Sequence, residues 1–412
     1  MDALSLPFRQ AGSPYDRAIL ALLVMFLLCS AFSIALTQIG YFSALTLWIG
    51  RMAYRRKWTL PSSPFDKYFL AYAVAEILAT VFAADKLYSL LYLQRRLLII
   101  PIIFVLLANI TTPAQLRMLF TALVTSAVGV ALWSLRTVIV HFADFLQFHR
   151  RLGEFQIYMT AGGIQMIALL LILPFIIHRN TPRKVRITAG IAVLPLLCNL
   201  FFTFTRSSWL GFITGVIIIG SLRSRKILFA LIALIVVVFL LSTPEMRERR
   251  MYSLVEPYHP DNISRLHMWT TGLRAFADHP LFGVGDVGME TIWSTYANPD
   301  WGTEGHLHNN IIMWLVTLGV VGCSVLVALF VKIWVVFWRA QKALREEWFA
   351  GSLALGGLAV LGGFHVNGLF EWNFGDAEII MLVWAVVGLL LAALKIASAN
   401  TPALAPGAAR TT

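Results

Sequence analysis

Charged residues are scarce in this sequence of 412 residues, in which Asp, Glu, Lys and Arg together make up 13%. A soluble protein carries about a quarter of such residues, so a soluble globular fold is excluded. Hydrophobic residues make up 58% of the chain, and they form apolar runs that recur along its whole length. Runs of about 20 residues are long enough to cross a bilayer as helices. Because every backbone polar group in hydrocarbon needs an internal partner, the runs predict membrane-spanning helices.

Cysteine and acidic metal-binding motifs are scarce as well. The three cysteines lie far apart in apolar runs, and this spacing favours neither a disulfide framework nor a cysteine metal site. The sequence has no Asp-x-Asp pair of the kind that many metal-dependent sugar transferases use, and no glycine loop that cradles phosphates. We therefore predict no metal ion and no other cofactor.

The apolar runs predict an all-α, polytopic membrane protein of about twelve transmembrane helices. The predicted spans cover residues 18–35, 38–54, 67–83, 91–109, 118–140, 156–177, 187–204, 208–221, 227–242, 308–331, 350–369 and 377–396. Twelve spans place both termini on one side, and most of the 33 Lys and Arg residues then flank the spans on that side. The positive-inside rule makes that side the cytoplasm. The net charge of +12 is thus a topology signal, and no nucleic-acid partner is predicted.

One connection, between the ninth and tenth predicted spans, is much longer than the others. A loop of this length is either functional or disordered, and its tryptophan, phenylalanine and tyrosine residues argue against disorder. Residues at helical spacing predict a helix within it, and they are Arg265, Trp269, Gly272 and Phe276. The predicted organisation is transmembrane helices 1–9 in residues 1–243, a loop outside the cytoplasm in residues 244–307 that is the candidate for a functional, catalytic part, transmembrane helices 10–12 in residues 308–396 and a disordered cytoplasmic tail in residues 397–412.

Arg265 is the first candidate for holding an anion. It lies on the predicted outer side of the membrane, where the positive-inside rule leaves few cationic residues. We expect it in the first turn of the loop helix, where free N–H groups and the helix dipole favour an anion. Its guanidinium suits two phosphate oxygens at once. The structural alternative is a salt bridge within the loop, with Asp261 or Glu256 as partner.

Other arginines on the outer side are weaker candidates. Arg206 lies at the junction of the seventh and eighth spans, and Arg95 and Arg96 lie at the mouth of the fourth span. A long cationic side chain at such a position can simply anchor its helix at the membrane interface, which is the structural alternative for all three. Arg150 and Arg151 are interpreted as part of a solvated face.

His308 is the candidate for proton transfer, because it lies where the long loop enters the tenth span. Near neutral pH a histidine can accept a proton from a sugar hydroxyl, although a satisfied interfacial histidine is the structural alternative. Gly319 and Gly322 predict a small-residue helix face beneath it. Glu304, His306 and His308 alternate, so an extended strand would present all three to a metal ion. Only the alternation favours such a site, and we predict that no metal is bound.

Three segments resemble the motifs of bacterial O-antigen ligases, which belong to the O-antigen ligase/polymerase superfamily. The segments are His308-Asn309 followed after nine residues by Gly319-Val320-Val321-Gly322, Arg265 and Trp269 followed by His279-Pro280-Leu281-Phe282-Gly283-Val284-Gly285, and Arg206 before Ser207-Ser208-Trp209. They cover roughly residues 200–325, and the rest of the chain is similar only in its layout of spans.

The resemblance implies a metal-independent membrane glycosyltransferase of the C type in the bacterial inner membrane, with its active site on the periplasmic side. It implies transfer of O-antigen polysaccharide from undecaprenyl diphosphate to lipid A–core oligosaccharide, with inversion of the anomeric centre. The expected partners are these two substrates and membrane lipid. Arg206 and Arg265 would hold the diphosphate, with Arg95 and Arg96 as further candidates, and His308 would activate the acceptor hydroxyl.

Three other functions fit part of the pattern. An O-antigen polymerase or a protein O-oligosaccharyltransferase would share the donor and the architecture. The polymerases tend to lack the histidine motif, and the oligosaccharyltransferases usually carry a further extracytoplasmic region after the last spans, which we do not expect here. A transporter or flippase would concentrate polar residues midway along broken helices, whereas these residues gather outside one leaflet.

Overall fold

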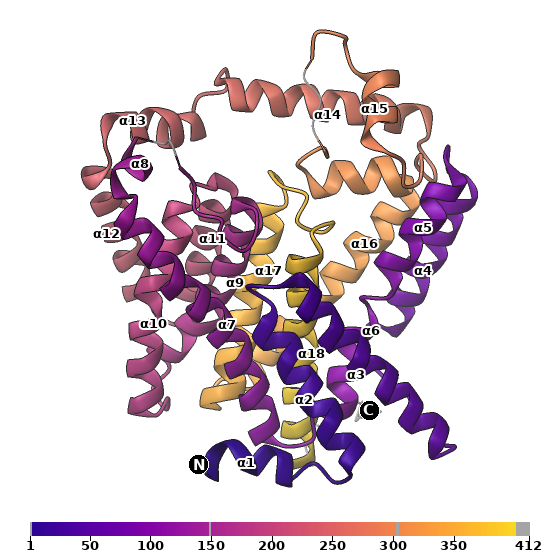
Figure 1. Cartoon of the computed structure of the whole chain (residues 1–412), viewed down its shortest axis with the longest axis vertical. Coiled ribbons are helices and arrows are strands. Elements are labelled where there is room, and N and C mark those ends of the chain that lie inside the picture. Colours follow the sequence, from indigo (N-terminus) through magenta and orange to yellow (C-terminus); the bar gives the residue numbers. More distant parts are fainter. Residues whose placement is uncertain (1, 148–149, 302–304, 401–412) are drawn as a thin grey trace, which may run out of the picture.

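The computed structural model describes residues 2–147, 150–301 and 305–400, and within these residues the chain is helical and forms no strand. Long helices run from one end of the molecule to the other (Figure 1). Two helices of the long loop, α14 (Pro260–Asp278) and α15 (Met289–Tyr296), lie across one end, and the short α1 (Asp2–Arg9) lies at the opposite end (Figure 1).

Each of the twelve predicted spans coincides with a helix. These helices are α2 (Pro14–Cys29), α3 (Ile34–Tyr54), α4 (Asp66–Val81), α5 (Lys86–Leu97) continued by α6 (Pro101–Asn109), α7 (Pro113–Val140), α9 (Tyr158–Ile177), α10 (Arg183–Phe202), α11 (Arg206–Leu222), α12 (Lys226–Leu241), α16 (Asn310–Ala343), α17 (Trp348–Asn367) and α18 (Ala377–Asn400). Within the described residues, seven are long and apolar enough to cross a membrane, namely α5–α6, α7, α9, α10, α16, α17 and α18, and α11 and α12 are shorter apolar helices. The chain is a multi-pass membrane protein, and the count of twelve spans stays a prediction.

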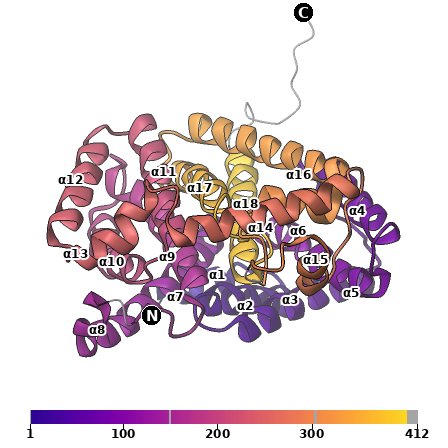
Figure 2. The same ribbon diagram turned by 90° about the horizontal axis from the view of Figure 1, so that it is seen from above.

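Three helices, α9, α17 and α18, form the centre of the bundle (Figure 2). The buried share of the most apolar stretch is 72% in α9, 78% in α17 and 83% in α18. In α10, at the periphery, it is 22%. Glycines let the central helices approach their neighbours closely. A Cβ atom on Gly211 of α11, for example, would lie 2.6 Å from the carbonyl oxygen of Gly363 in α17.

The predicted small-residue helix face beneath His308 is wrong, because α16 breaks at Gly319. This residue has a φ of 64°, which favours glycine, and a Cβ atom on it would collide with the carbonyl group of Leu281. Next to the break the backbone N–H of Val320 donates to the carbonyl of Pro280 at 2.8 Å. The prediction assumed an unbroken helical period, whereas at Gly319 the chain leaves the helical conformation and packs against residues 280–282 of the long loop.

The long loop forms a layer with its own hydrophobic core, as its aromatic residues predict. Its connecting segments are α13 (Pro244–Met246), a π-helical turn (Arg247–Met251) and a 3₁₀ turn (Tyr252–Leu254), which lead into α14. Buried side chains join α14 and α15 to the start of α16, and they are Met268, Ala275, Val284, Ile292, Trp293, Leu307, Ile312, Met313 and Val316. In addition, Trp269 donates its indole N–H to the carbonyl of Leu307 at 3.1 Å. This packing fixes the loop directly over the helix ends.

Candidate functional site

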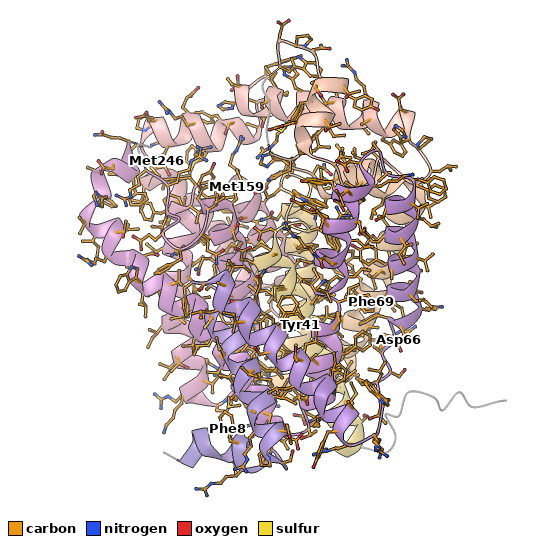
Figure 3. The ribbon with its side chains drawn as sticks, turned by 45° about the vertical axis from the view of Figure 1, so that its right-hand side comes forward. Phe8, Tyr41, Asp66, Phe69, Met159 and Met246 are labelled. Carbon is orange, nitrogen blue, oxygen red and sulfur yellow. The ribbon has the colours of Figure 1, made fainter. Side chains whose placement is uncertain are left out.

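A cavity of about 440 Å³ lies between α14 and the ends of α9 and α11. Met159, at the start of α9, lines it and lies near the end of the molecule that carries the loop (Figure 3). The arginine, histidine and carboxylate side chains on its wall are Arg151, Arg206, Arg250, Arg265, His308 and Glu371. The structure therefore brings together the three predicted catalytic residues, which come from three separate segments of the chain.

Arg206 is the first residue of α11 and is only 6% exposed. Its guanidinium donates to the carbonyl of Ser253 in the long loop, with an N–O distance of 2.9 Å. Thr205 and Ser207 line the same cavity, so the first turn of α11 faces it. Free backbone N–H groups and the helix dipole make such a helix start favourable for an anion.

Arg265 lies in the second turn of α14, and the prediction of a first-turn position was wrong. The helix begins at Pro260, because proline is well suited to the first helical position, whereas the prediction took a later residue as the cap. The Arg265 guanidinium lies 5.9 Å from the ring centre of Phe370, which supports it by a cation–π contact. The side chain of Asp261, one partner of the alternative salt bridge, lies outside the described side chains.

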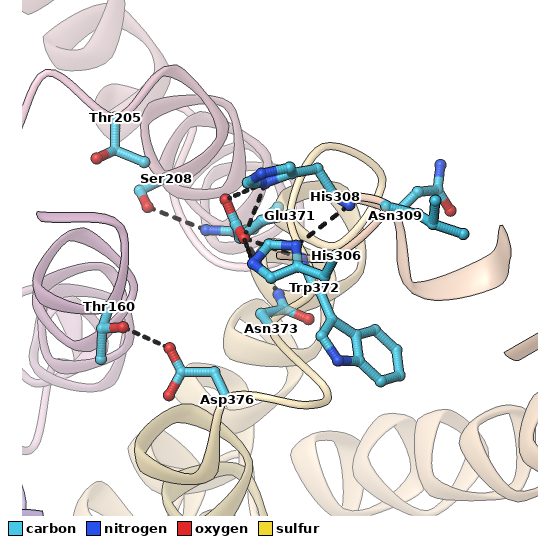
Figure 4. A network of polar contacts seen from close by, with 12 residues as sticks. Thr160, Thr205, Ser208, His306, His308, Asn309, Glu371, Trp372, Asn373 and Asp376 are labelled. Carbon is cyan, nitrogen blue, oxygen red and sulfur yellow. Dashed lines mark hydrogen bonds and ion pairs between the residues drawn. The ribbon is translucent and has the colours of Figure 1, made fainter. Parts of the chain in front are cut away.

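His308 pairs with Glu371, a partner that the sequence interpretation missed. The imidazole Nδ1 is 3.1 Å from each carboxylate oxygen, and both residues are 9% exposed (Figure 4). Burial alone would raise the pKa of Glu371, but the hydrogen bond and charge of His308 hold that pKa below its ordinary value. A carboxylate at Nδ1 favours the tautomer with its proton there and leaves Nε2 as an acceptor. His308 also has a left-handed backbone with a φ of 46°, a strained conformation that the surroundings must hold.

Asparagines hold the Glu371 turn against the start of α16. Asn309 caps α16, and its side chain donates to the carbonyl of Leu369 at 3.0 Å. The side-chain N–H of Asn310 donates to the side-chain oxygen of Asn373. These contacts come from segments on both sides of Glu371, so they set its position relative to His308.

The cavity next to the His308–Glu371 pair is rich in arginine. Among the described side chains on its wall, four guanidinium groups and one carboxylate surround a volume of a few hundred cubic ångströms. Fixed arginines in a partly water-excluded site stabilise phosphate oxygens through paired, charge-assisted hydrogen bonds. The arrangement suits a group with two or more phosphate charges held beside a proton acceptor.

Two of these arginines were not among the predicted site residues. Arg151, interpreted as part of a solvated face, lines the cavity and stacks on the Tyr158 ring at 4.6 Å. Arg250, in the long loop, lines it too. Like Arg206, both are cationic residues on the side of the membrane predicted to be outside the cytoplasm, where the positive-inside rule leaves few of them. The sequence alone could therefore have indicated Arg151 and Arg250 as candidates.

A second cavity, of about 800 Å³, contains Arg95 and Arg96, which the structure does not bring to the first one. Arg96 forms ion pairs with Glu76 at 3.1 Å and with Asp286 in the loop after α14. These two carboxylates compensate its charge, so Arg96 ties α4 and α5 to the loop. His306 lines this second cavity, whereas His308 lines the first.

Among the residues that the structure describes, His306, His308 and Glu371 form a group that could hold a metal ion. Their ligand atoms lie within 4.8 Å of one another, and nitrogen and carboxylate ligands of this kind suit Zn²⁺. Burial, and next the neighbouring His308, lowers the pKa of His306 to about 4, so its imidazole is neutral at pH 7. Glu304, the third residue of the alternating pattern, lies outside the described residues.

Residues 191–327 match the family model described as O-antigen ligase. The resemblance to the O-antigen ligase superfamily is confirmed. The matched segment contains Arg206, Arg265 and His308, while Glu371 lies beyond it. No curated protein matches the chain. Together with its apolar helices, the match supports a membrane-bound glycosyltransferase that acts on lipid-linked polysaccharide.

Proposed function

We propose that the protein is an O-antigen ligase of the bacterial inner membrane. It transfers O-antigen polysaccharide from undecaprenyl diphosphate to lipid A–core oligosaccharide on the periplasmic side, and both termini are cytoplasmic. The supporting observation is that Arg206, Arg265 and the His308–Glu371 pair meet on one cavity within and beside the matched segment.

The arginines act on the donor in this proposal. Arg206 and Arg265 hold the diphosphate, and Arg151 and Arg250 add positive charge to the same wall. As the bond between the anomeric carbon and the diphosphate oxygen breaks, negative charge grows on that oxygen. Guanidinium groups that are already in place stabilise this charge without rearrangement of solvent.

His308 acts on the acceptor. Nε2 takes the proton of a sugar hydroxyl while its oxygen bonds to the anomeric carbon from the face opposite the diphosphate. This displacement inverts the anomeric centre and releases undecaprenyl diphosphate. Glu371 holds Nδ1–H and stabilises the imidazolium that forms.

The second cavity offers room for the acceptor. It lies on the other side of His306 and is partly walled by aromatic side chains, among them Tyr88, Tyr92 and Trp372. Aromatic faces and a few polar groups suit the rings and hydroxyls of a sugar. We assign the core oligosaccharide to this cavity and the diphosphate to the first cavity. The two substrates then meet at the neighbouring rings of His306 and His308, whose centres lie 4.0 Å apart.

Reconstitution with both lipid substrates tests the proposal. We expect lipid A–core that carries O-antigen, detected by its altered gel mobility and mass. A longer glycan on undecaprenyl diphosphate alone would show a polymerase, and glycan on a protein acceptor would show an oligosaccharyltransferase. Movement of the donor between leaflets without a joined product would show a transporter.

A further inference from the structure

A third cavity, of about 430 Å³, lies at the end of the bundle opposite the long loop. Its place follows from α18, which starts beside Asp376 near the site and reaches this cavity with Lys395. Four cationic residues line the cavity, and they are Arg51, Arg55, Lys57 and Lys395. Among the described residues on its wall, none carries a carboxylate.

Neighbouring groups hold two of these cations in fixed places. Arg51 forms a close ion pair with Asp16, which also lies 3.8 Å from Arg55. Lys395 donates to the carbonyl of Leu107 in the last turn of α6, with an N–O distance of 2.6 Å. One carboxylate beside four cations leaves the cavity with a surplus of positive charge.

The rest of the wall is apolar. Trp48, Met52, Leu60 and Leu107 line the cavity. Close by in sequence, Tyr54 is 77% exposed and Trp58 is 66% exposed, which is typical of aromatic side chains that lie at the membrane–water interface. Cationic and apolar side chains thus line the same cavity, next to aromatic residues of the kind found at the membrane–water interface, where lipid head groups lie.

The positive-inside rule explains why cations gather on this side, but not why four of them converge on a cavity. Arg183 and Lys184 show the difference. They lie at the same end, because α9 runs away from the site before α10 begins, yet both are exposed and are not among the residues that line the cavity. Basic pockets between membrane helices bind the head groups of anionic lipids.

We propose that this cavity binds the phosphate head group of an anionic phospholipid. The phosphate oxygens lie against the exposed Arg55, Lys57 and Lys395 and against the half-buried Arg51. The acyl chains run along the apolar wall beside Trp48. A lipid with two phosphates, such as cardiolipin, suits the four cations best. The bound lipid joins α3 to α6 and α18 and stabilises the end of the bundle away from the site.

The test uses the full-length protein, purified in a neutral detergent. Cardiolipin, phosphatidylcholine or inorganic phosphate is titrated in, and binding is followed by thermal unfolding and by native mass spectrometry. The variant Arg55→Gln with Lys57→Gln removes two exposed cations and spares Arg51 and Lys395, which pair with Asp16 and with the Leu107 carbonyl. Arg55→Gln alone removes one of the two charges. Arg183→Gln with Lys184→Gln is the matched control, with the same loss of charge at the same end.

The expected result is that cardiolipin raises the unfolding temperature of the wild type and phosphatidylcholine does not. Each cation near an anionic lipid contributes roughly a fivefold gain in affinity, so the double variant should bind cardiolipin about 25-fold more weakly. The control pair should bind like the wild type. Equal weakening in both double variants would overturn the proposal in favour of a diffuse charge effect. Equal protection by inorganic phosphate would overturn it in favour of an ion site.

Discussion

At the scale of single residues, Arg265 provides the sharpest test of donor binding. Lysine keeps the charge but loses the two-pronged geometry, so Arg265→Lys should remain badly impaired. Arg265→Ala removes the contact to the growing charge and should lower kcat by about 10²–10³-fold. Ligation rates of purified variants measure both effects.

Arg274 gives the matched control for this prediction. It lies on the same helix, is exposed, and donates to the carbonyl of Tyr296, away from the cavity. Arg274→Lys should therefore ligate like the wild type. A wild-type rate in correctly inserted Arg265→Ala would remove Arg265 from the mechanism.

Variants of His308 test whether this residue acts on the acceptor hydroxyl and not on the donor diphosphate. A general base contributes about 10²–10⁴-fold, so His308→Ala should insert and bind donor but fail to transfer. His308→Gln keeps a hydrogen bond but cannot take the proton. Substantial activity in the Gln variant would mean that the histidine only positions the hydroxyl. Donor binding by both variants, measured with labelled lipid, shows that the fold is intact.

Glu371 leads to a prediction about pH. The pKa of Glu371 lies below its ordinary value of 4.5, so the ionised carboxylate stabilises the folded protein above about pH 4.5. This contribution disappears as the pH falls through the lowered pKa. Wild type should therefore unfold at a higher temperature than Glu371→Gln at pH 6–8, and the gap should close below pH 4.5.

Two further measurements sharpen the Glu371 prediction. Because the carboxylate also fixes the tautomer of His308, Glu371→Gln should lose at least about 10²-fold in rate at pH 7. Glu256→Gln is a control, since Glu256 is an exposed carboxylate of the long loop. A gap in unfolding temperature that stays constant down to pH 3 would contradict the role of the ionised pair.

At the scale of elements, the break in α16 is the feature to test. Gly319→Ala puts a Cβ atom into the Leu281 carbonyl at a φ of 64°, so it should destabilise the protein by more than the about 1–3 kcal/mol of backbone strain alone. Gly129→Ala in α7 meets nothing within 4 Å and should leave the unfolding temperature equal or higher. Equal unfolding temperatures for Gly319→Ala and wild type would contradict the account of the break.

Helix positions were predictable because a helix that crosses the bilayer needs about 20 mostly apolar residues. Such a run can be recognised in the local sequence. The loop helix followed from its period, since α14 contains the predicted Arg265, Trp269 and Phe276. The break at Gly319 was not predictable in this way, because a glycine within an apolar run is compatible with both a continuous and a broken helix.

The partners of the site residues depend on contacts between distant parts of the chain. Glu371 meets His308 across 63 residues, and only the turn between α17 and α18 brings it there. Arg96 meets Asp286 across 190 residues, which takes it away from the arginines of the first cavity. Local sequence patterns do not indicate contacts between residues so far apart in the chain. The sequence therefore predicted the candidate site residues but not which of them share a cavity.

At the scale of the whole molecule, the question is where the charge for the reaction comes from. Arginines from α11, α14 and two loops converge on one cavity, so cationic groups already line the place proposed for the diphosphate. A divalent ion would therefore duplicate what the protein already holds in place. We expect ligation by the purified protein to survive exhaustive chelation with EDTA.

The cluster of His306, His308 and Glu371 makes this last prediction a demanding one, because its ligand atoms are close enough to share a metal ion. In the proposed mechanism Glu371 must instead hold Nδ1 of His308, and a metal bound between them would remove that hydrogen bond. Added Zn²⁺ should then inhibit, and EDTA should restore the rate. Loss of activity with EDTA that Mg²⁺ or Mn²⁺ restores would reverse the argument. It would give a role in metal-assisted transfer to the cluster, or to the carboxylates Asp376 and Glu378 at the start of α18.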